Sequence, residues 1–580
     1  MSEHIIDRVG IIGSPSTTAE LTIDIVEKAN SRALLGDMVY TAHEAGGEHM
    51  VALGTVTEIE TRNRWHEDPN MRGVLRVHGT LPHLSADGDV RTAKVRVQAV
   101  YRADSAHPPF AEAPSEDGGA LGMSPTTGTP VCTVTEELVQ GLVERHKDDL
   151  VYLGRIYRTD VRLPMYVRNF TEPGSDGAYH TGIFGRNGSG KTVLAARFMA
   201  MQLRFPDMGM LVFDPQGQFT APGRGLPVDV QEIAKRYGHP VQLYSVAEDV
   251  RLKKNAPLLI ELLENSSFFR NLTIKMRDAR EALGAELVRL LTSPDLVDWD
   301  DCESDDLLRN LLGALVGDDA ALTRVLNTAG PRTRVANAMQ TAMDEATAFA
   351  LLLRDFEPLH SLFRKGKRTP LGSIIHDLIG AKPGPRPLVV LDLSASSGAA
   401  WLDDDGVRAR IMSEVLRHVR IAADSSWQDA GTPVNCSIVF DEAHRFAASK
   451  NEDPNIDALM QRIIRDVRET RKVGIGWTFI TQQVRSISPA IFAQLRIKAF
   501  GYGLTSGADL DVLRDELSDP RSLELYRSFA DPSTRKDPSD RVYPFMLTGP
   551  VSPLSVTAAP VYLQTYTSET EFAGSNEIPG

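Results

Sequence analysis

The sequence is poor in the features that mark secreted and membrane proteins. Its 580 residues include only three cysteines, which lie far apart and lack the paired spacing of a disulfide framework or a zinc site: Cys132, Cys302 and Cys436. No run of about 18 apolar residues occurs, so we expect no membrane-spanning segment. The N-terminal residues MSEHIIDRVG lack a basic stretch followed by an apolar core, so we expect no secretory signal there. These absences together predict a cytoplasmic protein with no membrane partner.

A net positive charge is also lacking. The formal charge is −14, while 42% apolar and 24% charged residues fit a soluble globular protein. Because affinity for phosphate comes largely from Lys and Arg, an acidic chain is a poor general binder of nucleic acid. The charge therefore argues against a protein that coats or wraps DNA. It leaves open a ring that threads DNA, which needs only a local basic lining of its channel.

The N-terminal part shows the period of two that is typical of β-strands. Apolar residues alternate with polar ones over residues 19–25 and again over residues 93–101. Several short strands with glycine turns predict a small β-barrel, which we assign to residues 1–165. Residues 108–130 are rich in proline, glycine and serine, so we expect a mobile loop in this domain.

The pattern changes near residue 178. Short apolar runs such as GMLVF, PLVVLDL and CSIVF alternate with helical patterns. Such continuous runs suit strands buried on both faces, so they predict an α/β domain with a parallel sheet covered by helices. Helix-like segments replace the strands in the middle of this domain. The predicted parts are a core over residues 166–255 and 381–548, an α-helical insertion over 256–380, and a C-terminal tail over 549–580 with one strand-like piece.

The strongest single motif is GRNGSGKT at residues 185–192, between an apolar run and a helical pattern. Its glycines allow a tight turn whose N–H groups point at phosphate oxygens, and the following helix adds its positive end. Lys191 would reach the β and γ phosphates of ATP, and the hydroxyl of Thr192 would bind Mg²⁺. The predicted nucleotide-binding residues here are Gly185, Arg186, Asn187, Gly188, Ser189, Gly190, Lys191, Thr192 and Val193.

Hydrolysis also requires an acidic partner, and SIVFDEAHRF supplies one. Asp441 and Glu442 end an apolar run. Asp441 would hold Mg²⁺, and Glu442 would orient or deprotonate the attacking water. Alternatively, an Asp–Glu pair at a strand end only caps the next helix. The phosphate-binding motif favours the catalytic interpretation.

Two further strand ends fit the same site. Asp214 ends GMLVFD, at the edge where parallel sheets bind ligands, so we predict that it contacts the nucleotide. An Asx turn before Pro215 explains it equally well. In FITQQ, Thr481 and Gln482 end another buried run, where the amide of Gln482 would sense the γ-phosphate; a plain strand end is the alternative.

A basic cluster lies just before that last strand, in QRIIRDVRETRKVGIG. Charges on a helix usually form only a solvated face. Phosphoryl transfer, however, often uses a cation delivered from outside the site. If the protein forms a ring, Arg471 or Lys472 would serve the ATP of a neighbouring subunit.

Taken in order, these segments resemble the HerA branch of the HerA/FtsK superfamily. The N-terminal part also resembles that family's barrel domain, in VGIIGSPSTTAELTIDI, the LGDMV turn and ALGTVTEI. The motifs that carry the resemblance are GRNGSGKT, DPQGQF, DEAHRF, RETRKVGIG and TQQ.

The resemblance implies a RecA-like P-loop NTPase core in a homo-hexamer that threads double-stranded DNA. Its barrel domains would dock a partner enzyme, such as a nuclease or a sirtuin-like effector. Lys191, Thr192, Asp441, Glu442 and Gln482 would form the site within one subunit, and Arg471 and Lys472 would act on the next. Two departures affect the sensing residues: Gln218 replaces the usual acidic residue, and Gln483–Val484 replaces Arg-Pro.

Four functions compete at this point. The first is a DNA translocase or helicase-like motor with an effector partner, in DNA end processing or anti-phage defence. The second is a remodeller of proteins, for which Trp401 would be the aromatic step of a pore loop. The third is a conjugative or secretion ATPase, against which the absence of a membrane-spanning run counts. The fourth is an assembly scaffold whose ATP site controls a partner.

Basic residues that could line a pore are harder to predict. Segments 396–402 and 447–454 follow core strands, and Lys450 in the second is a candidate phosphate contact. RKGKR at 364–368 is the densest basic run, and an ordinary surface loop explains it equally well.

Overall fold

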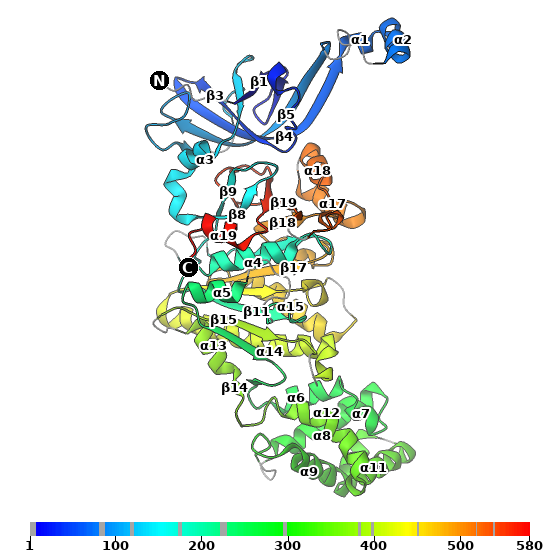
Figure 1. The fold of residues 1–580 in the computed structure, drawn as a ribbon. Coiled ribbons are helices and arrows are strands. Elements are labelled where there is room, and N and C mark those ends of the chain that lie inside the picture. The colour runs from blue at the N-terminus through cyan, green and yellow to red at the C-terminus, as the bar shows by residue number, and fades with distance from the viewer. Residues whose placement is uncertain are drawn as a thin grey trace.

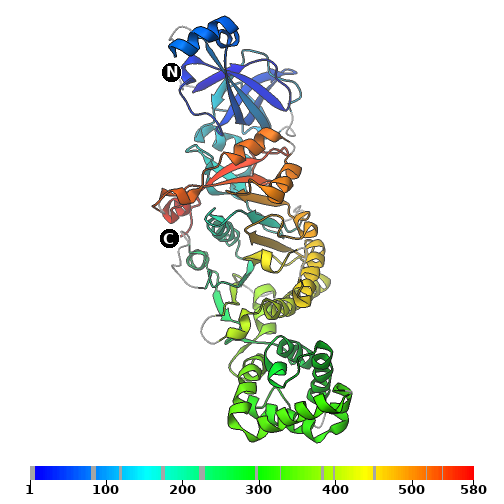
Figure 2. The same cartoon turned by 90° about the vertical axis from the view of Figure 1, so that its right-hand side faces the viewer.

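The computed structural model consists of three parts stacked along one elongated molecule (Figures 1 and 2). A β-barrel lies at one end, a large sheet with its helices lies in the middle, and an all-helical part lies at the other end. The predicted fold class, an α/β P-loop core with an N-terminal barrel and a helical insertion, is confirmed. The structure describes residues 7–79, 87–116, 121–171, 177–220, 229–293, 298–326, 328–380, 384–395, 399–448, 452–517, 519–537 and 540–580.

Six strands close the N-terminal barrel in the order β2-β1-β7-β3-β4-β5, with β5 pairing back onto β2. The expected alternation holds, since Leu21 and Ile23 of β2 and Val95 and Val97 of β5 are all buried in the barrel core. A short strand β6 extends the sheet beyond β5. The bounds are β1 Arg8–Ile12, β2 Glu20–Ile25, β3 Met38–Ala45, β4 Glu48–Asn63, β5 Asp89–Ala103, β6 Ser115–Glu116 and β7 Pro130–Thr133.

The hairpin of β4 and β5 extends beyond the barrel. Two short helices, α1 (Arg64–Glu67) and α2 (Pro69–His78), lie at its far end, away from the rest of the molecule (Figure 1). Asp68 caps α2 by accepting hydrogen bonds from the backbone N–H groups of Asn70 and Met71.

The central sheet has eleven strands in the order β12-β15-β11-β16-β17-β10-β18-β19-β20-β8-β9. The seven strands from β12 to β18 are parallel and the others are antiparallel. The parallel strands are β10 Thr181–Phe184, β11 Gly209–Asp214, β12 Val241–Ser245, β15 Leu388–Asp392, β16 Cys436–Phe440, β17 Ile475–Thr481 and β18 Ile497–Gly501. The antiparallel strands are β8 Leu150–Ile156, β9 Arg162–Tyr166, β19 Tyr543–Thr548 and β20 Val561–Thr565.

Helices cover both faces of this sheet, as continuous apolar strands require. Alternate residues of β11 enter different cores: Val212 packs with α4 and α5, whereas Leu211 packs with α14 and α15. The helices around the sheet are α3 Glu136–Val143, α4 Lys191–Gln202, α5 Val230–Arg236, α13 Leu371–Ile379, α14 Asp405–Ala430, α15 Pro454–Glu469, α16 Pro489–Phe492, α17 Gly507–Glu516, α18 Pro520–Arg527 and α19 Glu569–Ser575.

The helical part is inserted between β13 and β14, a short parallel ladder of Val250–Arg251 with Thr369–Pro370. Its interior is apolar, with Phe268, Phe356 and Trp299 fully buried. The helices are α6 Ala256–Glu264, α7 Phe268–Asn271, α8 Arg277–Thr292, α9 Ser304–Gly317, α10 Asp319–Val325, α11 Ala329–Asp344 and α12 Ala346–His360.

Two predicted boundaries differ from the structure. Strands β8 and β9 precede residue 166 but pair within the central sheet, so the barrel does not extend to 165. The segment 549–580 is not a peripheral tail, because β20 lies between β19 and β8 and α19 packs beside β8. Pairing between segments so distant in sequence leaves no local pattern, which is why the sequence did not indicate either one.

The barrel is attached to the sheet through the C-terminal region. The guanidinium of Arg521 in α18 lies 2.6 Å from the carboxylate of Glu20 and 2.5 Å from that of Glu58, both in the barrel. The hydroxyl of Tyr101 donates a hydrogen bond of 2.7 Å to the carbonyl oxygen of Pro553. Helix α18 accordingly lies between the barrel and the sheet in Figure 1.

Candidate nucleotide-binding site

The GRNGSGKT loop connects β10 to α4 at the carboxyl edge of the parallel sheet. Gly188 and Gly190 have φ angles of 80° and 86°, in the left-handed region that favours glycine. Arg186 and Asn187 are exposed, whereas Ser189 is fully buried, and its Oγ has no hydrogen-bond partner among the described residues. The loop therefore has the backbone form of a phosphate cradle.

Lys191 is the first residue of α4 and is buried. Its Nζ donates a hydrogen bond of 3.2 Å to the carbonyl oxygen of Arg186, so the side chain folds back over the loop. Burial lowers the pKa of Lys191, and the carboxylates of Glu442 and Asp441 partly oppose that shift. The ammonium group thus lies between the loop and the acidic pair, where a polyphosphate would meet both. Thr192 follows it on α4 and is partly exposed.

Asp441 and Glu442 follow β16 at the same edge of the sheet. Asp441 is 2% exposed, and within the described part of the chain its Oδ2 has no hydrogen-bond partner. Burial, together with the charges of Glu442 and Asp214, raises the pKa of Asp441 to about 7. A buried carboxylate oxygen that lacks a partner fits Mg²⁺, which prefers oxygen ligands and would relieve the crowding of negative charge. Asp441 and Thr192 would hold the ion.

Glu442 has a strained backbone, with φ 49° and ψ 43°. This left-handed conformation costs a non-glycine residue about 1 kcal/mol or more and is common where function fixes the geometry. The Nε2 atom of Gln482 donates to its carboxylate oxygens at 3.3 and 3.4 Å, and Nδ1 of His444 lies 3.1 Å away. Burial alone would raise the pKa of Glu442, but His444, Lys191 and Gln482 lower it. Glu442 is therefore held as a carboxylate.

The sequence analysis missed His444. The only local signal was its position two residues after Glu442 in DEAHRF, which did not indicate which way the ring turns. The left-handed Glu442 and the 3₁₀ turn of Ala443–Arg445 bring the imidazole back onto the carboxylate.

Asp214 is fully buried at the end of β11. Its carboxylate accepts hydrogen bonds from the backbone N–H groups of Gln218 at 3.0 Å and Phe219 at 2.7 Å. Burial nevertheless raises its pKa. These bonds hold the DPQGQF turn in place, so they favour the Asx-turn alternative, and contact of Asp214 with nucleotide stays a prediction.

Residues 151–419 match the model of one protein family, described as the central domain of the helicase HerA. This segment of the chain is therefore similar to the central domain of HerA. No curated protein matches it. The HerA match contains the phosphate-binding loop but ends before Asp441, so the assignment of the acidic pair and Gln482 depends on their geometry.

Solved structures are less similar to this chain. VirB4 of Thermoanaerobacter pseudethanolicus has 13% identity and a TM-score of 0.41, covering 73% of this chain and 97% of its own. The conjugation coupling protein TcpA of pCW3 has 10% identity and a TM-score of 0.29, covering 98% and 91%. The genome packaging NTPase B204 of Sulfolobus turreted icosahedral virus 2, in complex with AMPPCP, has 10% identity and a TM-score of 0.28, covering 67% and 98%. At these scores the likenesses carry no argument about function.

Arg471 and Lys472 lie at the opposite edge of the sheet, just before β17 begins. Because β17 and β10 are parallel, the phosphate-binding loop lies beyond their other ends. Strand β17 has 7 residues and runs from the amino edge of the sheet to the carboxyl edge. At about 3.3 Å per residue, the two edges are about 20 Å apart. Neither side chain can therefore reach the site of its own subunit.

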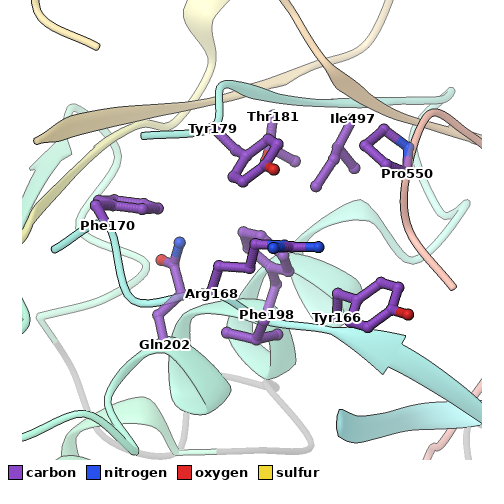
Figure 3. A pocket seen from close by; sticks show the side chains of 10 residues that line it. Tyr166, Arg168, Phe170, Tyr179, Thr181, Phe198, Gln202, Ile497 and Pro550 are labelled. Atoms are coloured by element: carbon purple, nitrogen blue, oxygen red, sulfur yellow. The ribbon is translucent and has the colours of Figure 1, made fainter. Parts of the chain in front are cut away.

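Other basic groups share this amino edge. Figure 3 shows a small pocket there, in which Arg168 lies among Tyr166, Tyr179 and Gln202. The guanidinium of Arg168 lies 5.1 Å from the ring centre of Tyr166 and 5.6 Å from that of Tyr179, and Arg496 stacks on Tyr179 from 4.7 Å. This pocket is not the nucleotide site, because it lies at the wrong ends of β10 and β18.

The structure gives little support to the basic residues that were predicted to line a pore. Lys450 and its two neighbours, and residues 396–398, lie outside the described residues. Two of the four basic residues in the RKGKR run are paired with carboxylates: Arg364 pairs with Glu303, and Lys365 lies 3.5 to 3.7 Å from Asp298, Asp300 and Asp301. A surface role explains that run better than a DNA contact.

No described helix is long and apolar enough to cross a membrane. No group of three or more His, Cys, Asp or Glu side chains gathers as a metal site in the described ranges.

Proposed function

We propose that this chain hydrolyses ATP as one subunit of a six-membered ring, as the resemblance to HerA implies, and that the ring moves double-stranded DNA through a central channel. The observation that carries the proposal is the separation of charges on one sheet. Lys191, Asp441 and Glu442 converge at its carboxyl edge, whereas Arg471 and Lys472 lie at its amino edge. A site divided in this way is complete only between two copies.

We propose a role for each residue of this site. The N–H groups of the loop and Lys191 bind the phosphates of ATP, and Thr192 and Asp441 hold Mg²⁺, which would neutralise charge on the phosphates. Glu442, held as a carboxylate, accepts a proton from the attacking water, and Gln482 orients that carboxylate. Arg471 or Lys472 of a neighbouring subunit would stabilise the charge that develops as the γ-phosphate leaves.

The net charge of −14 limits how DNA is held. A protein this acidic binds a duplex poorly on its outer surface, so contact is confined to the interior of the ring. The barrel domains stand at one end of the molecule and are the natural place for a partner, such as a nuclease, a sirtuin-like enzyme or another effector. DNA end processing and anti-phage defence are both compatible with such an assembly.

The test is ATP hydrolysis by the purified chain with and without linear duplex DNA, with solution mass recorded in the same preparation. The expected result is a DNA-stimulated rate from a particle of several subunits, lost in Glu442→Gln. A rate indifferent to duplex DNA, or a chain that stays monomeric, would overturn the motor. Stimulation by unfolded protein would identify a remodeller, and activity only with a co-purified partner would identify a scaffold.

A further inference from the structure

We propose that Tyr543 is the platform on which the base of the bound nucleotide stacks. The inference deepens the proposed function, because it concerns the ATP site and assumes that ATP binds there. No sequence motif marks this residue, which lies far along the chain from the phosphate-binding loop at residues 185–192.

The order of the strands indicates on which side of β10 the triphosphate lies and on which side the base lies. The acidic residues and Gln482 follow β16 and β17, which lie on one side of β10. These groups act on the γ-phosphate, so the triphosphate ends on that side of the loop. The ribose and base must leave on the other side, where β18 pairs with β10 and β19 pairs with β18.

Strand β19 is antiparallel, and this brings its first residue to the nucleotide edge. Gly501, at the carboxyl end of β18, pairs with Phe545 of β19. Tyr543 begins β19 two residues earlier, so it extends past the end of β18 toward the loop. The turn that follows β18 also contacts the phosphate-binding loop. In this turn, the carbonyl oxygen of Tyr502 accepts a hydrogen bond of 3.1 Å from the N–H of Arg186.

The ring of Tyr543 packs directly against the phosphate-binding loop. A Cβ at residue 190 would lie 2.5 Å from ring atoms of Tyr543, so only glycine allows the ring this close. Tyr543 is partly exposed, and a flat aromatic face with an open side is what a base requires. Arg186, in the same loop, is exposed, and its Nη2 lies 3.4 Å from Oγ of Ser506.

The alternative is that Tyr543 only supports the loop from outside. The two roles differ in what they predict for a ligand without a base. A supporting residue would affect every polyphosphate equally, whereas a platform would affect only ligands that carry a base. Inorganic tripolyphosphate presents the phosphates of ATP alone and therefore separates the two.

The experiment measures the affinities of the full chain for ATP and for inorganic tripolyphosphate, both with Mg²⁺, by calorimetry. In Tyr543→Ala, we expect ATP to bind about five- to a hundredfold more weakly, which is the usual effect of losing one base–aromatic stack. Tripolyphosphate should bind as it does to the wild type. Tyr543→Phe keeps the ring and should bind ATP within about twofold of the wild type.

Tyr244→Ala provides a matched control, because this partly buried tyrosine lies on the edge strand β12, far along the sheet. It should change neither affinity. Equal weakening of ATP and tripolyphosphate in Tyr543→Ala would overturn the inference, as would an unchanged ATP affinity. A wild-type chain that binds tripolyphosphate but not ATP would also overturn it. A wild-type chain that binds neither would contradict the proposed function itself.

Discussion

The side-chain amide of Gln482 donates to both carboxylate oxygens of Glu442, at 3.3 and 3.4 Å. The two residues end up together because β16 and β17 are neighbouring parallel strands that end at the same edge. The amide thus fixes the orientation of the carboxylate that we assign as the base. We also predict that this amide senses the γ-phosphate.

Glu442→Gln should abolish most hydrolysis and leave ATP binding intact. The variant keeps the size of the side chain but cannot accept the proton, so we expect the rate to fall about 10²- to 10⁴-fold. Gln482→Ala should lower the rate less, because the base is retained but no longer oriented. Steady-state rates and nucleotide affinity measured on the same samples test this. Equal loss of affinity and rate would mean that Glu442 is only structural.

The assignment of Arg471 and Lys472 to a neighbouring site predicts complementation. A chain with Arg471→Ala and Lys472→Ala should be inactive alone, and so should Glu442→Gln. A mixture of the two inactive chains should regain part of the wild-type rate. At some interfaces, Glu442 of the double variant then meets Arg471 and Lys472 of the Glu442→Gln variant. Arg468→Ala, an exposed cation on α15, is the control and should be active alone. Failure of the mixture to recover any activity would contradict the trans assignment.

Arg521 is predicted to hold the barrel onto the motor. Its contacts with Glu20 and Glu58 join two parts of the molecule, so Arg521→Ala should weaken their docking by about 1 kcal/mol. Hydrogen exchange should become faster at the barrel–sheet contact. Arg527→Ala is the matched control, since that arginine pairs with Glu524 within the same helix. Identical exchange in both variants would show that Arg521 does not hold the barrel.

Asp37 should make stability depend on pH. Burial raises its pKa to about 6 from the usual 3.8, although Arg158 and Arg32 oppose the shift. The folded chain therefore binds this proton more tightly than the unfolded chain, and stability falls as pH rises from about 4 through about 6. Asp37→Asn removes that cost. The variant should gain about 1 kcal/mol over the wild type at pH 7.5, a value reduced for the partial exposure of the side chain.

Thermal unfolding at several pH values tests this expectation. The difference between Asp37→Asn and the wild type should shrink as the pH falls through about 6 and approach zero only below about pH 4. Asp160→Asn, at a side chain that is 98% exposed, controls for the removal of a surface carboxylate. A difference that is the same at every pH would show that Asp37 is not the cause.

The sequence predicted what is local. Lys191 and its loop, the acidic pair and the strand ends could be recognised because each lies within a short segment where glycine, apolar runs and carboxylates have fixed spacing. The alternation in β2 and β5 likewise indicated the barrel. Contacts between distant segments could not be predicted, and these include Tyr543 on Gly190, Arg521 on Glu20 and β20 within the sheet. They depend on strand order, which single-sequence periodicity does not encode.

The most direct measurement is displacement of a third strand from a triplex at the far end of a linear DNA duplex. Our account predicts that the chain displaces this strand with ATP, and fails to do so with a non-hydrolysable analogue or in the Glu442→Gln variant. Such a result would establish movement along double-stranded DNA powered by hydrolysis at this site. Hydrolysis stimulated by duplex DNA without any displacement of the third strand would contradict the central claim that the protein is a DNA motor.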